Sequence, residues 1–480
     1  MSDIDLLELS RRGPVHFVGV SGAGVSALAE LVLHNGGAVT GCDLKPGEVG
    51  DTLRARGASI HDGHDPSHVQ DAVAVVTTAA VPADHPELVA ARERGIPVLK
   101  RAAALGAIVN SGTVVGIAGT HGKTTTTAMT TLVLEAGGLD PTGFVGGRVA
   151  AWGGNLRPGS SDIYVVEADE YDRSFHQLRA DAAVVTTLEA DHLDIFGSLE
   201  EVERAFEKFL EPIPETGLIA VCGDDAGAAA LGDRVNHPGV RRYGTGATCQ
   251  LRATDVAVSG SSMRFEVGEG DRSLGHVTLQ VPGLHNLRNS LAAIAVGLHF
   301  NVPFDDIRRA LAGYRAVARR FQVLGEAGGV VVVDDYAHHP TEVRATLQAA
   351  RDAYTRRRLV AVFQPHLYTR TRDFHREFGQ ALGAADVVWV SDVYPAREKP
   401  IEGVTGELVA NAAREAGADV RYHASLDELR DALRHDVASG DLLLTMGAGD
   451  VNRIGAELFR ELSAADGAPT GAAGNGGGAA

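Results

Sequence analysis

The sequence predicts an α/β protein of three domains, each built on a mostly parallel β-sheet. The chain has 480 residues, which is too many for one hydrophobic core and suggests about three domains. Short apolar segments alternate with helical ones along most of the chain, as they do in parallel sheets. Two glycine-rich loops, at 19–24 and 116–122, each follow an apolar strand and precede a helix. Such loops bind phosphate groups in folds of this class.

The composition of the chain limits the classes of protein to which it can belong. Hydrophobic residues make up 44% and charged residues 22% of the chain, as in ordinary globular proteins. The net charge of −18 argues against a nucleic-acid partner, which requires a basic face. No apolar signal region and no run of transmembrane length is present, so we expect a cytoplasmic monomer or homodimer without membrane insertion. The cysteines, Cys42, Cys222 and Cys249, are too few and too scattered for a disulfide framework or a structural zinc site.

Residues 1–110 are predicted to form a Rossmann-like domain. A strand at 15–19 runs into Gly22-Ala23-Gly24 and an apolar helix, and further strands are expected at 38–42, 72–76 and 97–99. Asp43 ends the second strand, roughly where a Rossmann fold carries its acidic residue. Because Ser21 takes the second glycine position of G-x-G-x-x-G, this pattern is weak, and a nicotinamide-binding domain is the alternative interpretation.

Residues 111–322 are predicted to form a central P-loop-type ATPase domain. The strand 113–118 leads through Gly119–Gly122 to Lys123 and a helix from Thr124 to about 135. Loop amides and the helix N-terminus point at an anion, Lys123 reaches the β/γ-phosphates, and Thr124 ligates Mg²⁺. The match to G-x-x-x-x-G-K-[ST] is imperfect because Ile117 holds the first glycine position. An ordinary glycine-rich turn is the alternative.

Two further strands of this domain end in acidic residues. The strand 163–167 ends at Glu167, and the strand 182–187 leads to an Asp-His-Leu-Asp stretch at 191–194. An acid at a strand end beside a phosphate loop is where a Mg²⁺ ligand belongs. Asn286 begins an expected helix at 286–300, and its spacing alone indicates a helix cap.

Residues 323–463 are predicted to form a second Rossmann-like domain. A continuous apolar strand at 329–334 indicates burial on both faces, and strands at 359–363, 387–390, 420–422 and 442–445 alternate with helices. Functional loops lie at the carboxyl ends of such strands, where the segments 335–342 and 364–372 fall. The low-complexity tail 464–480 is expected to be disordered.

These motifs resemble those of the Mur ligases, ATP-dependent enzymes that build the peptide of the bacterial cell wall. The stretches G-T-H-G-K-T-T-T at 119–126, E-A-D-E at 167–170, D-H-L-D at 191–194 and H-N-x-x-N at 285–289 follow the family order. The segments 16–26, 335–342 and 364–372 resemble the branch that attaches L-alanine. Departures are Thr187, where the family usually has Asn, and Leu367, where some relatives have Arg.

The resemblance implies roles for individual residues. ATP binding is implied for Gly119, Thr120, His121, Gly122, Lys123, Thr124, Thr125, His285, Asn286, Asn289, Arg320 and Asp335. UDP-sugar binding is implied for Gly22, Ala23, Gly24, Asp43, His64, Thr77, Thr78 and Arg101. Amino-acid binding is implied for Tyr336, His338, His366 and Arg370, and Mg²⁺ binding for Thr124, Glu167 and His192. The implied catalytic residues are Lys123, His192, His338 and Arg370.

On this resemblance we expect an ATP- and Mg²⁺-dependent ligase that joins L-alanine to the carboxylate of UDP-N-acetylmuramate. A related ligase that attaches a whole tripeptide to the same nucleotide sugar is the nearest alternative. A nicotinamide-dependent oxidoreductase would leave the Lys123 loop and both acidic strand ends without a role. A non-catalytic nucleotide-binding protein is the third alternative.

Overall fold

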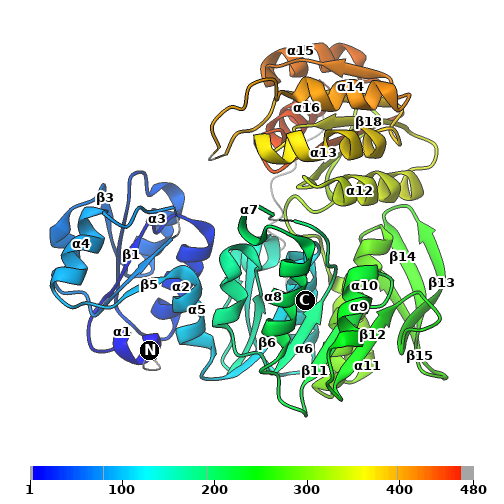
Figure 1. Ribbon diagram of the computed structural model, residues 1–480. Coiled ribbons are helices and arrows are strands. Elements are labelled where there is room, and N and C mark those ends of the chain that lie inside the picture. Colours follow the sequence, from blue (N-terminus) through cyan, green and yellow to red (C-terminus); the bar gives the residue numbers. More distant parts are fainter. Residues whose placement is uncertain (1–3, 79, 192, 397, 466–480) are drawn as a thin grey trace. The chain divides into compact units, whose positions relative to one another are not determined.

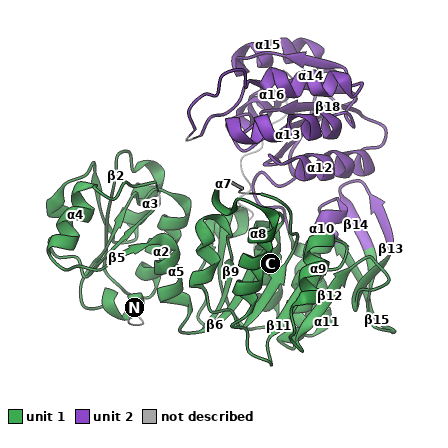
Figure 2. Cartoon of the chain, viewed as in Figure 1, with its two compact units in different colours: residues 1–255, 265–278, 288–314 green, residues 256–264, 279–287, 315–480 purple. Residues whose placement is uncertain are grey.

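The structure is a computed structural model that describes residues 4–78, 80–191, 193–396 and 398–465. The chain divides into two compact units (Figure 2). Unit 1 contains residues 1–255, 265–278 and 288–314, and unit 2 contains residues 256–264, 279–287 and 315–480. The predicted three-domain α/β class is confirmed, because the strands form three sheets in which parallel pairing predominates.

The first sheet is parallel throughout, with strand order β3-β2-β1-β4-β5 (Figure 1). Its strands are β1 (Val15–Val18), β2 (Val39–Asp43), β3 (Ser59–Asp62), β4 (Ala74–Thr77) and β5 (Val98–Lys100). Its helices are α1 (Leu6–Ser10), α2 (Ala23–His34), α3 (Gly47–Ala55), α4 (Pro86–Glu93) and α5 (Arg101–Val109), with a 3₁₀ turn at Pro66–Val69. The sequence analysis missed β3, an edge strand whose single buried apolar residue is Ile60.

The end of α5 joins the first sheet to the second. The Asn110 side chain donates a hydrogen bond from Nδ2 to the carbonyl oxygen of Gln177 at 2.8 Å. Its Oδ1 accepts one from the Arg179 backbone amide at 2.9 Å. Gly106, one turn earlier, lies so close to the same carbonyl that a β-carbon would stand 2.4 Å from its oxygen. The Asn110 carboxamide and Gly106 therefore help to join the first two sheets within unit 1.

The second sheet has ten strands in the order β15-β14-β13-β12-β11-β10-β6-β9-β7-β8. They are β6 (Thr113–Ala118), β7 (Thr142–Val149), β8 (Gly154–Arg157), β9 (Ile163–Glu167), β10 (Ala182–Val185), β11 (Leu218–Cys222), β12 (Val240–Gly244), β13 (Leu251–Ser259), β14 (Ser262–Glu269) and β15 (Arg272–Leu279). The helices are α6 (Lys123–Ala136), α7 (Leu193–Phe196), α8 (Leu199–Leu210), α9 (Ala226–Arg234), α10 (Leu284–His299) and α11 (Phe304–Gly313), with 3₁₀ turns at Ala150–Trp152 and Tyr171–Gln177.

The position of β6 in this sheet brings three loops together. β6 pairs in parallel with β9 on one side and β10 on the other. The carboxyl ends of the three strands therefore lie at one edge of the sheet, side by side. The loops that leave this edge contain the Lys123 segment, the acids after Glu167 and the residues after Val185.

The third sheet has the order β16-β17-β21-β18-β19-β20, and only its edge strand β16 is antiparallel. Its strands are β16 (Gln322–Ala327), β17 (Val330–Asp335), β18 (Arg358–Phe363), β19 (Val387–Val390), β20 (Val420–Tyr422) and β21 (Asp441–Met446). Its helices are α12 (Pro340–Ala353), α13 (Tyr368–Leu382), α14 (Gly406–Glu415), α15 (Leu426–Asp436) and α16 (Asn452–Ala465). α16 extends two residues into the tail that was predicted to begin at 464, and the rest of that tail lies outside the described residues.

Both faces of this sheet are buried, as the apolar run at 329–334 predicts. Val331 and Val333 pack with α12, α13 and α14, whereas Val330 and Val332 pack with α15 and α16. Successive residues of a strand point to opposite faces, so one strand serves two cores. Within the described part of the chain, no helix combines the length and the apolar character needed to cross a membrane.

Candidate functional site: a phosphate loop, a second glycine loop and a histidine pocket

The loop between β6 and α6 has a backbone that only glycine accommodates at two positions. Gly119 has a φ of +134°, and a β-carbon there would stand 2.0 Å from Thr186 Oγ1. Gly122 has a φ of +82° at the N-cap of α6, and a β-carbon would stand 2.6 Å from Asn289 Oδ1. The loop thus bends tightly into the start of a fourteen-residue helix, which leaves helix N–H groups facing any anion bound there.

The end of β10 holds this loop in place. The backbone amide of Thr120 donates to the Thr187 carbonyl at 3.0 Å, and that of His121 donates to Thr187 Oγ1 at 2.9 Å. The Thr186 hydroxyl donates to the His121 carbonyl. Thr187 is a departure from the family pattern, and its hydroxyl oxygen serves here as an acceptor for the loop.

Lys123 is the buried cation of the loop. Its Nζ donates to the Gly119 carbonyl at 2.6 Å and to Glu170 Oε1 and Oε2 at 3.0 and 2.8 Å. Burial alone would lower the pKa of Lys123, but the carboxylates of Glu170, Asp169 and Glu167 outweigh it and raise the pKa above its ordinary value. The ammonium group is therefore charged and is held in place at the N-terminus of α6.

Glu167 and Thr124 lie together, as the strand ends predict. The Glu167 carboxylate accepts from the Gly146 backbone amide, and the nearby Thr124 side chain lowers the pKa of Glu167. Burial raises the pKa of Glu167, which a nearby cation would reverse. Carboxylate and hydroxyl oxygens are ligands that Mg²⁺ accepts, so this pair fits the ion. The third predicted ligand, His192, lies outside the described residues.

The H-N-x-x-N stretch divides between the two units. In unit 1, Asn289 lies against Gly122, and Arg288 Nε donates to Asp224 Oδ2 at 2.9 Å. In unit 2, Asn286 Nδ2 donates to the Pro282 carbonyl at 2.7 Å. Because α10 begins at Leu284, Asn286 lies inside its first turn, so the interpretation as a helix cap is wrong. The flanking His285 lies against Gly283, where a β-carbon would stand 2.5 Å from its ring.

The first sheet presents its own glycine loop at the end of β1. Asp43 Oδ2 accepts from the Ser21 backbone amide at 3.1 Å, so the acid at the end of β2 positions the loop. Arg101 lies on Gly24, where a β-carbon would stand 2.9 Å from Arg101 Cδ. Thr78, which follows β4, lies near Gly19. The structure therefore brings most of the predicted UDP-sugar residues to the carboxyl edge of this sheet.

His64 has a different environment from these residues. Its Nδ1 lies 3.2 Å from Cys42 Sγ, and its side chain is 21% exposed. The predicted role of His64 in UDP-sugar binding stays a prediction. Sequence reasoning missed Asn155 on β8, whose Nδ2 donates to the Ala23 carbonyl at 2.6 Å and ties the second sheet to the glycine loop. No motif marks Asn155.

The third sheet gathers rings and guanidinium groups at the carboxyl ends of β17 and β18. Tyr336 stands edge-on to His338, with ring centroids 5.2 Å apart, and His338 stands 5.8 Å from His366. The guanidinium carbons of Arg319 and Arg320 lie 5.0 and 5.1 Å from the Tyr336 ring centroid. The predicted amino-acid residues thus form one cluster within unit 2.

Arg370 belongs to the same cluster. It is 7% exposed in the first turn of α13, and its charge acts on His338. Leu367, the other departure from the family pattern, precedes that helix with a φ of +69° and donates its amide to the Tyr394 carbonyl at 3.0 Å. Tyr394, which sequence reasoning missed, stacks on His366 at 5.8 Å.

Asp335 and the turn at 447–450 support this cluster. The Asp335 carboxylate accepts from the backbone amides of Phe321 and Ala337, both at 2.7 Å, and burial raises its pKa to about 6. Gln364 Nε2 donates to Asp450 Oδ1 at 2.9 Å, and Gly449 packs against Tyr394. The turn at 447–450 therefore has a structural role.

Three family models match consecutive parts of the chain. The Mur ligase family catalytic domain matches residues 14–113, the Mur ligase middle domain matches 117–297, and the Mur ligase glutamate ligase domain matches 319–449. The chain belongs to the Mur ligase family.

Curated relatives of this Mur ligase match nearly its whole length. A UDP-N-acetylmuramate–L-alanine ligase of Geobacter sp. (strain M21) is 44% identical over 452 residues, which are 94% of this chain and 98% of that protein. One from Acidothermus cellulolyticus is 44% identical and covers 94% of both chains. Among solved structures, the UDP-N-acetylmuramate-alanine ligase MurC of Thermotoga maritima superposes with a TM-score of 0.79 at 28% identity, covering 94% of this chain and 100% of that one. A murein peptide ligase from Psychrobacter arcticus shares the fold, with a TM-score of 0.67 at 24% identity over 94% of this chain and 98% of that one.

The predicted role of the phosphate loop in ATP binding can be tested through the glycines of the loop. We expect Gly122→Ala to weaken binding of an ATP analogue at least tenfold, because the methyl group meets Asn289 and strains the left-handed backbone. Gly138→Ala is the control, since Gly138 has a φ of +76° at the other end of α6 with nothing within 4 Å. It should lower stability by about 1 kcal/mol and leave affinity unchanged. Equal loss of affinity in both variants, measured by calorimetry, would refute the assignment.

The His338 ring should be neutral in the working Mur ligase. Burial lowers its pKa to about 4, Arg370 acts in the same direction, and Glu342 opposes them. Below pH 4 the ring would protonate, and above it the ring stays neutral. We expect the His338 ring resonances, identified by their loss in His338→Gln, to stay constant between about pH 5 and 8 in an NMR titration. A midpoint near 6.5 would contradict the buried environment.

Proposed function

We propose that this Mur ligase joins L-alanine to the carboxylate of UDP-N-acetylmuramate, with ATP converted to ADP and phosphate. The observation that supports it most is the 44% identity, over 94% of the chain, to curated ligases that carry this name. The geometry agrees, since a charged phosphate loop, a second glycine loop and a cluster of rings with an arginine are all formed.

The reaction has two chemical steps. A carboxylate oxygen of the muramoyl group attacks the γ-phosphorus of ATP, the bond to the β,γ-bridging oxygen breaks, and ADP leaves. The amine of L-alanine then attacks the acyl carbon of the acyl phosphate. The resulting tetrahedral intermediate loses phosphate and the amine loses a proton, which leaves an amide.

Lys123 and the loop amides are assigned to the first step. The Lys123 ammonium group is held by Glu170 and the Gly119 carbonyl, so it is in place before the nucleotide binds. Phosphoryl oxygens would compete with Glu170 for that charge. Fixed donors aimed at the transferring group account for most catalysis in such reactions, because little covalent work falls to the protein.

Thr124 and Glu167 are assigned to Mg²⁺, which would neutralise charge on the phosphate oxygens. The Thr124 hydroxyl lies close enough to lower the pKa of Glu167, which supports assigning both oxygens to one ion. Asp335 and Arg320 are assigned to the nucleotide, and Gly22, Gly24, Asp43 and Arg101 to the UDP-sugar.

The ring cluster is assigned to the amino acid. His338 Nδ1 lies 2.9 Å from the Tyr336 carbonyl, which can only accept a hydrogen bond. The proton of the neutral ring therefore sits on Nδ1, which leaves Nε2 as an acceptor. Nε2 can orient the incoming amine, while Arg370 binds the carboxylate of L-alanine.

The proposed function is tested by measuring phosphate release with UDP-N-acetylmuramate, ATP, Mg²⁺ and a panel of acceptors. L-Alanine should react fastest, and glycine roughly tenfold more slowly because it lacks one methyl group. Faster turnover of L-alanyl-γ-D-glutamyl-diaminopimelate would establish the tripeptide ligase instead. Nucleotide binding without turnover of any acceptor would indicate a non-catalytic protein.

The magnesium assignment predicts that Glu167→Gln raises the Mg²⁺ concentration needed for half-maximal activity by about tenfold or more, since one anionic ligand is lost. Asp172→Asn is the matched control, because Asp172 follows the same strand but is exposed and pairs with Lys100. Its Mg²⁺ titration should match that of the unaltered enzyme. An unchanged titration of Glu167→Gln would place the ion elsewhere.

The assignment of Arg370 to the L-alanine carboxylate predicts a selective loss of apparent affinity for L-alanine. Arg370→Ala should raise the KM for L-alanine by roughly 30-fold or more and leave the KM for ATP nearly unchanged, because a charge-assisted pair contributes about 2–4 kcal/mol. Arg372→Ala is the control, since Arg372 lies two residues away, is exposed and pairs with Asp373. A parallel rise in both KM values of Arg370→Ala would indicate disturbed folding of the third domain rather than a lost substrate contact.

A further inference from the structure

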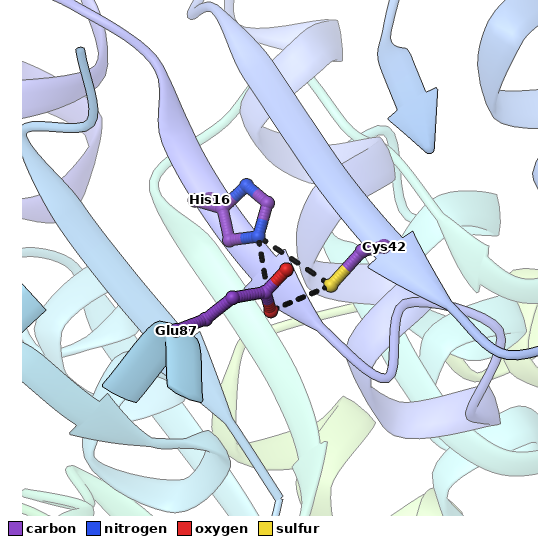
Figure 3. A group of neighbouring side chains, drawn as sticks. All are labelled: His16, Cys42 and Glu87. Atoms are coloured by element: carbon purple, nitrogen blue, oxygen red, sulfur yellow. Dashed lines mark hydrogen bonds and ion pairs between the residues drawn. The ribbon is translucent and has the colours of Figure 1, made fainter. Parts of the chain in front are cut away.

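The N-terminal domain contains a group of histidines around one cysteine and one glutamate. This group, the Cys42 cluster, consists of His16 on β1, Cys42 on β2, His64 after β3, and His85 and Glu87 at the start of α4. His16, Cys42 and Glu87 are completely buried and point toward one another (Figure 3). No step of the proposed reaction uses them.

The facing atoms have the spacing of metal ligands. Cys42 Sγ lies 2.9 Å from Glu87 Oε2 and 3.5 Å from His16 Nε2, and the last two atoms are 3.7 Å apart. Three atoms so arranged leave a point about 2.0 Å from each, close to Zn–N and Zn–O bond lengths of about 2.0–2.2 Å. A slightly longer Zn–S bond moves the ion just out of their plane.

Two histidines lie where a fourth ligand belongs. His64 Nδ1 is 3.2 Å from Cys42 Sγ and 3.6 Å from Glu87 Oε2. His85 Nδ1 is 4.0 Å from the same carboxylate oxygen, and although this nitrogen is buried it has no hydrogen-bond partner among the described residues. Their side chains are 21% and 12% exposed, so they form the solvent-facing side through which an ion can enter.

The surrounding contacts orient the ligand atoms. His16 Nδ1 lies 2.9 Å from Thr40 Oγ1, which leaves Nε2 facing the cysteine. Glu87 Oε1 accepts from His68 Nδ1 at 2.7 Å and from the Asp65 amide at 3.1 Å, so only Oε2 faces the cluster. Metal-binding histidines and carboxylates are held in this way by a second layer of hydrogen bonds.

The Cys42 cluster can accept a cation, although hydrogen bonds from Cys42, His68 and the Asp65 amide already stabilise the Glu87 carboxylate. Among the described residues, every ion pair that Glu87 makes is with a histidine, and neither lysine nor arginine reaches it. A buried carboxylate requires a charged partner or several hydrogen bonds. A divalent ion bound to this carboxylate and a thiolate would give a neutral centre, with the thiol proton released to solvent.

We propose that the Cys42 cluster is a zinc site, in which Cys42 Sγ, His16 Nε2 and Glu87 Oε2 bind the ion and His64 or His85 completes a tetrahedral set. A mixed sulfur, nitrogen and oxygen donor set suits Zn²⁺ better than Mg²⁺ or Ca²⁺, which take oxygen ligands. The proposal departs from the expectation, drawn from the scattered cysteines, that the chain holds no structural zinc site. The proposed site uses a single cysteine and takes its other ligands from strand β1, the loop after β3 and the start of helix α4.

The test uses the full-length chain without an affinity tag, stripped of metal by a chelator and kept reduced. Co²⁺ replaces Zn²⁺ as a coloured probe. We expect a thiolate-to-cobalt charge-transfer band in the near ultraviolet, tetrahedral d–d bands in the visible, and loss of both when equimolar Zn²⁺ is added. Co²⁺ at the predicted Mg²⁺ site has oxygen ligands and gives no thiolate band. Absence of the thiolate band from the unaltered protein would overturn the proposal whatever the variants do.

Cysteine variants identify which sulfur atom binds the metal ion. Cys42→Ser should lose the charge-transfer band and the zinc-dependent rise in melting temperature. Cys222→Ser and Cys249→Ser should keep both, since these cysteines are also buried and free but lie in the second sheet's domain. The fourth ligand is identified with His64→Gln and His85→Gln, which change the two histidines at the solvent-facing side. The variant that removes the fourth ligand should shift the visible d–d bands, and the other should leave them unchanged. A thiolate band that survives Cys42→Ser, or that disappears in Cys222→Ser, would also overturn it.

Discussion

The buried ion pair between Lys123 and Glu170 is the interaction on which the proposed catalytic site depends. A lysine ammonium group without a partner could not stay charged at so buried a position, and a neutral amine would be useless to a phosphate. Glu170 supplies this partner, and in the proposed reaction phosphate oxygens would compete with it for the ammonium group. The pairing is possible because β6 lies directly beside β9, so that the residues following both strands leave the sheet together.

The same adjacency explains how much of the site could be predicted. Lys123, Thr124 and Glu167 are each recognisable from a strand that ends in a loop of the right chemistry, and parallel strands bring such ends together. The division of labour among the acids at 167–170 could not be predicted from the sequence. Four neighbouring positions contain three carboxylates, and only the backbone path after β9 decides that Glu167 meets Thr124 while Glu170 meets Lys123.

Contacts made by residues that belong to no recognisable motif could not be predicted from the sequence either. Asn155 and Tyr394 sit on a short hairpin strand and a loop, where neither periodicity nor spacing distinguishes them, yet each touches a loop with an assigned role. The edge strand β3 was missed because one apolar residue in four gives no alternating pattern. The parallel strands β17, β18, β19, β20 and β21 of the third sheet were predicted within a residue or two, because most of them are buried on both faces and continuously apolar. The antiparallel edge strand β16 was missed.

The carboxamide of Asn110 has a practical consequence for dissecting this protein. A fragment beginning at 111 would contain every strand of the second sheet. It would remove the partner of the Gln177 carbonyl and of the Arg179 amide, and it would uncover the surface against which Gly106 packs. A fragment that starts before α5 keeps these contacts but includes Arg101, which belongs to the glycine loop of the first sheet. Helix α5 is thus shared between two domains, and no single cut point separates them cleanly.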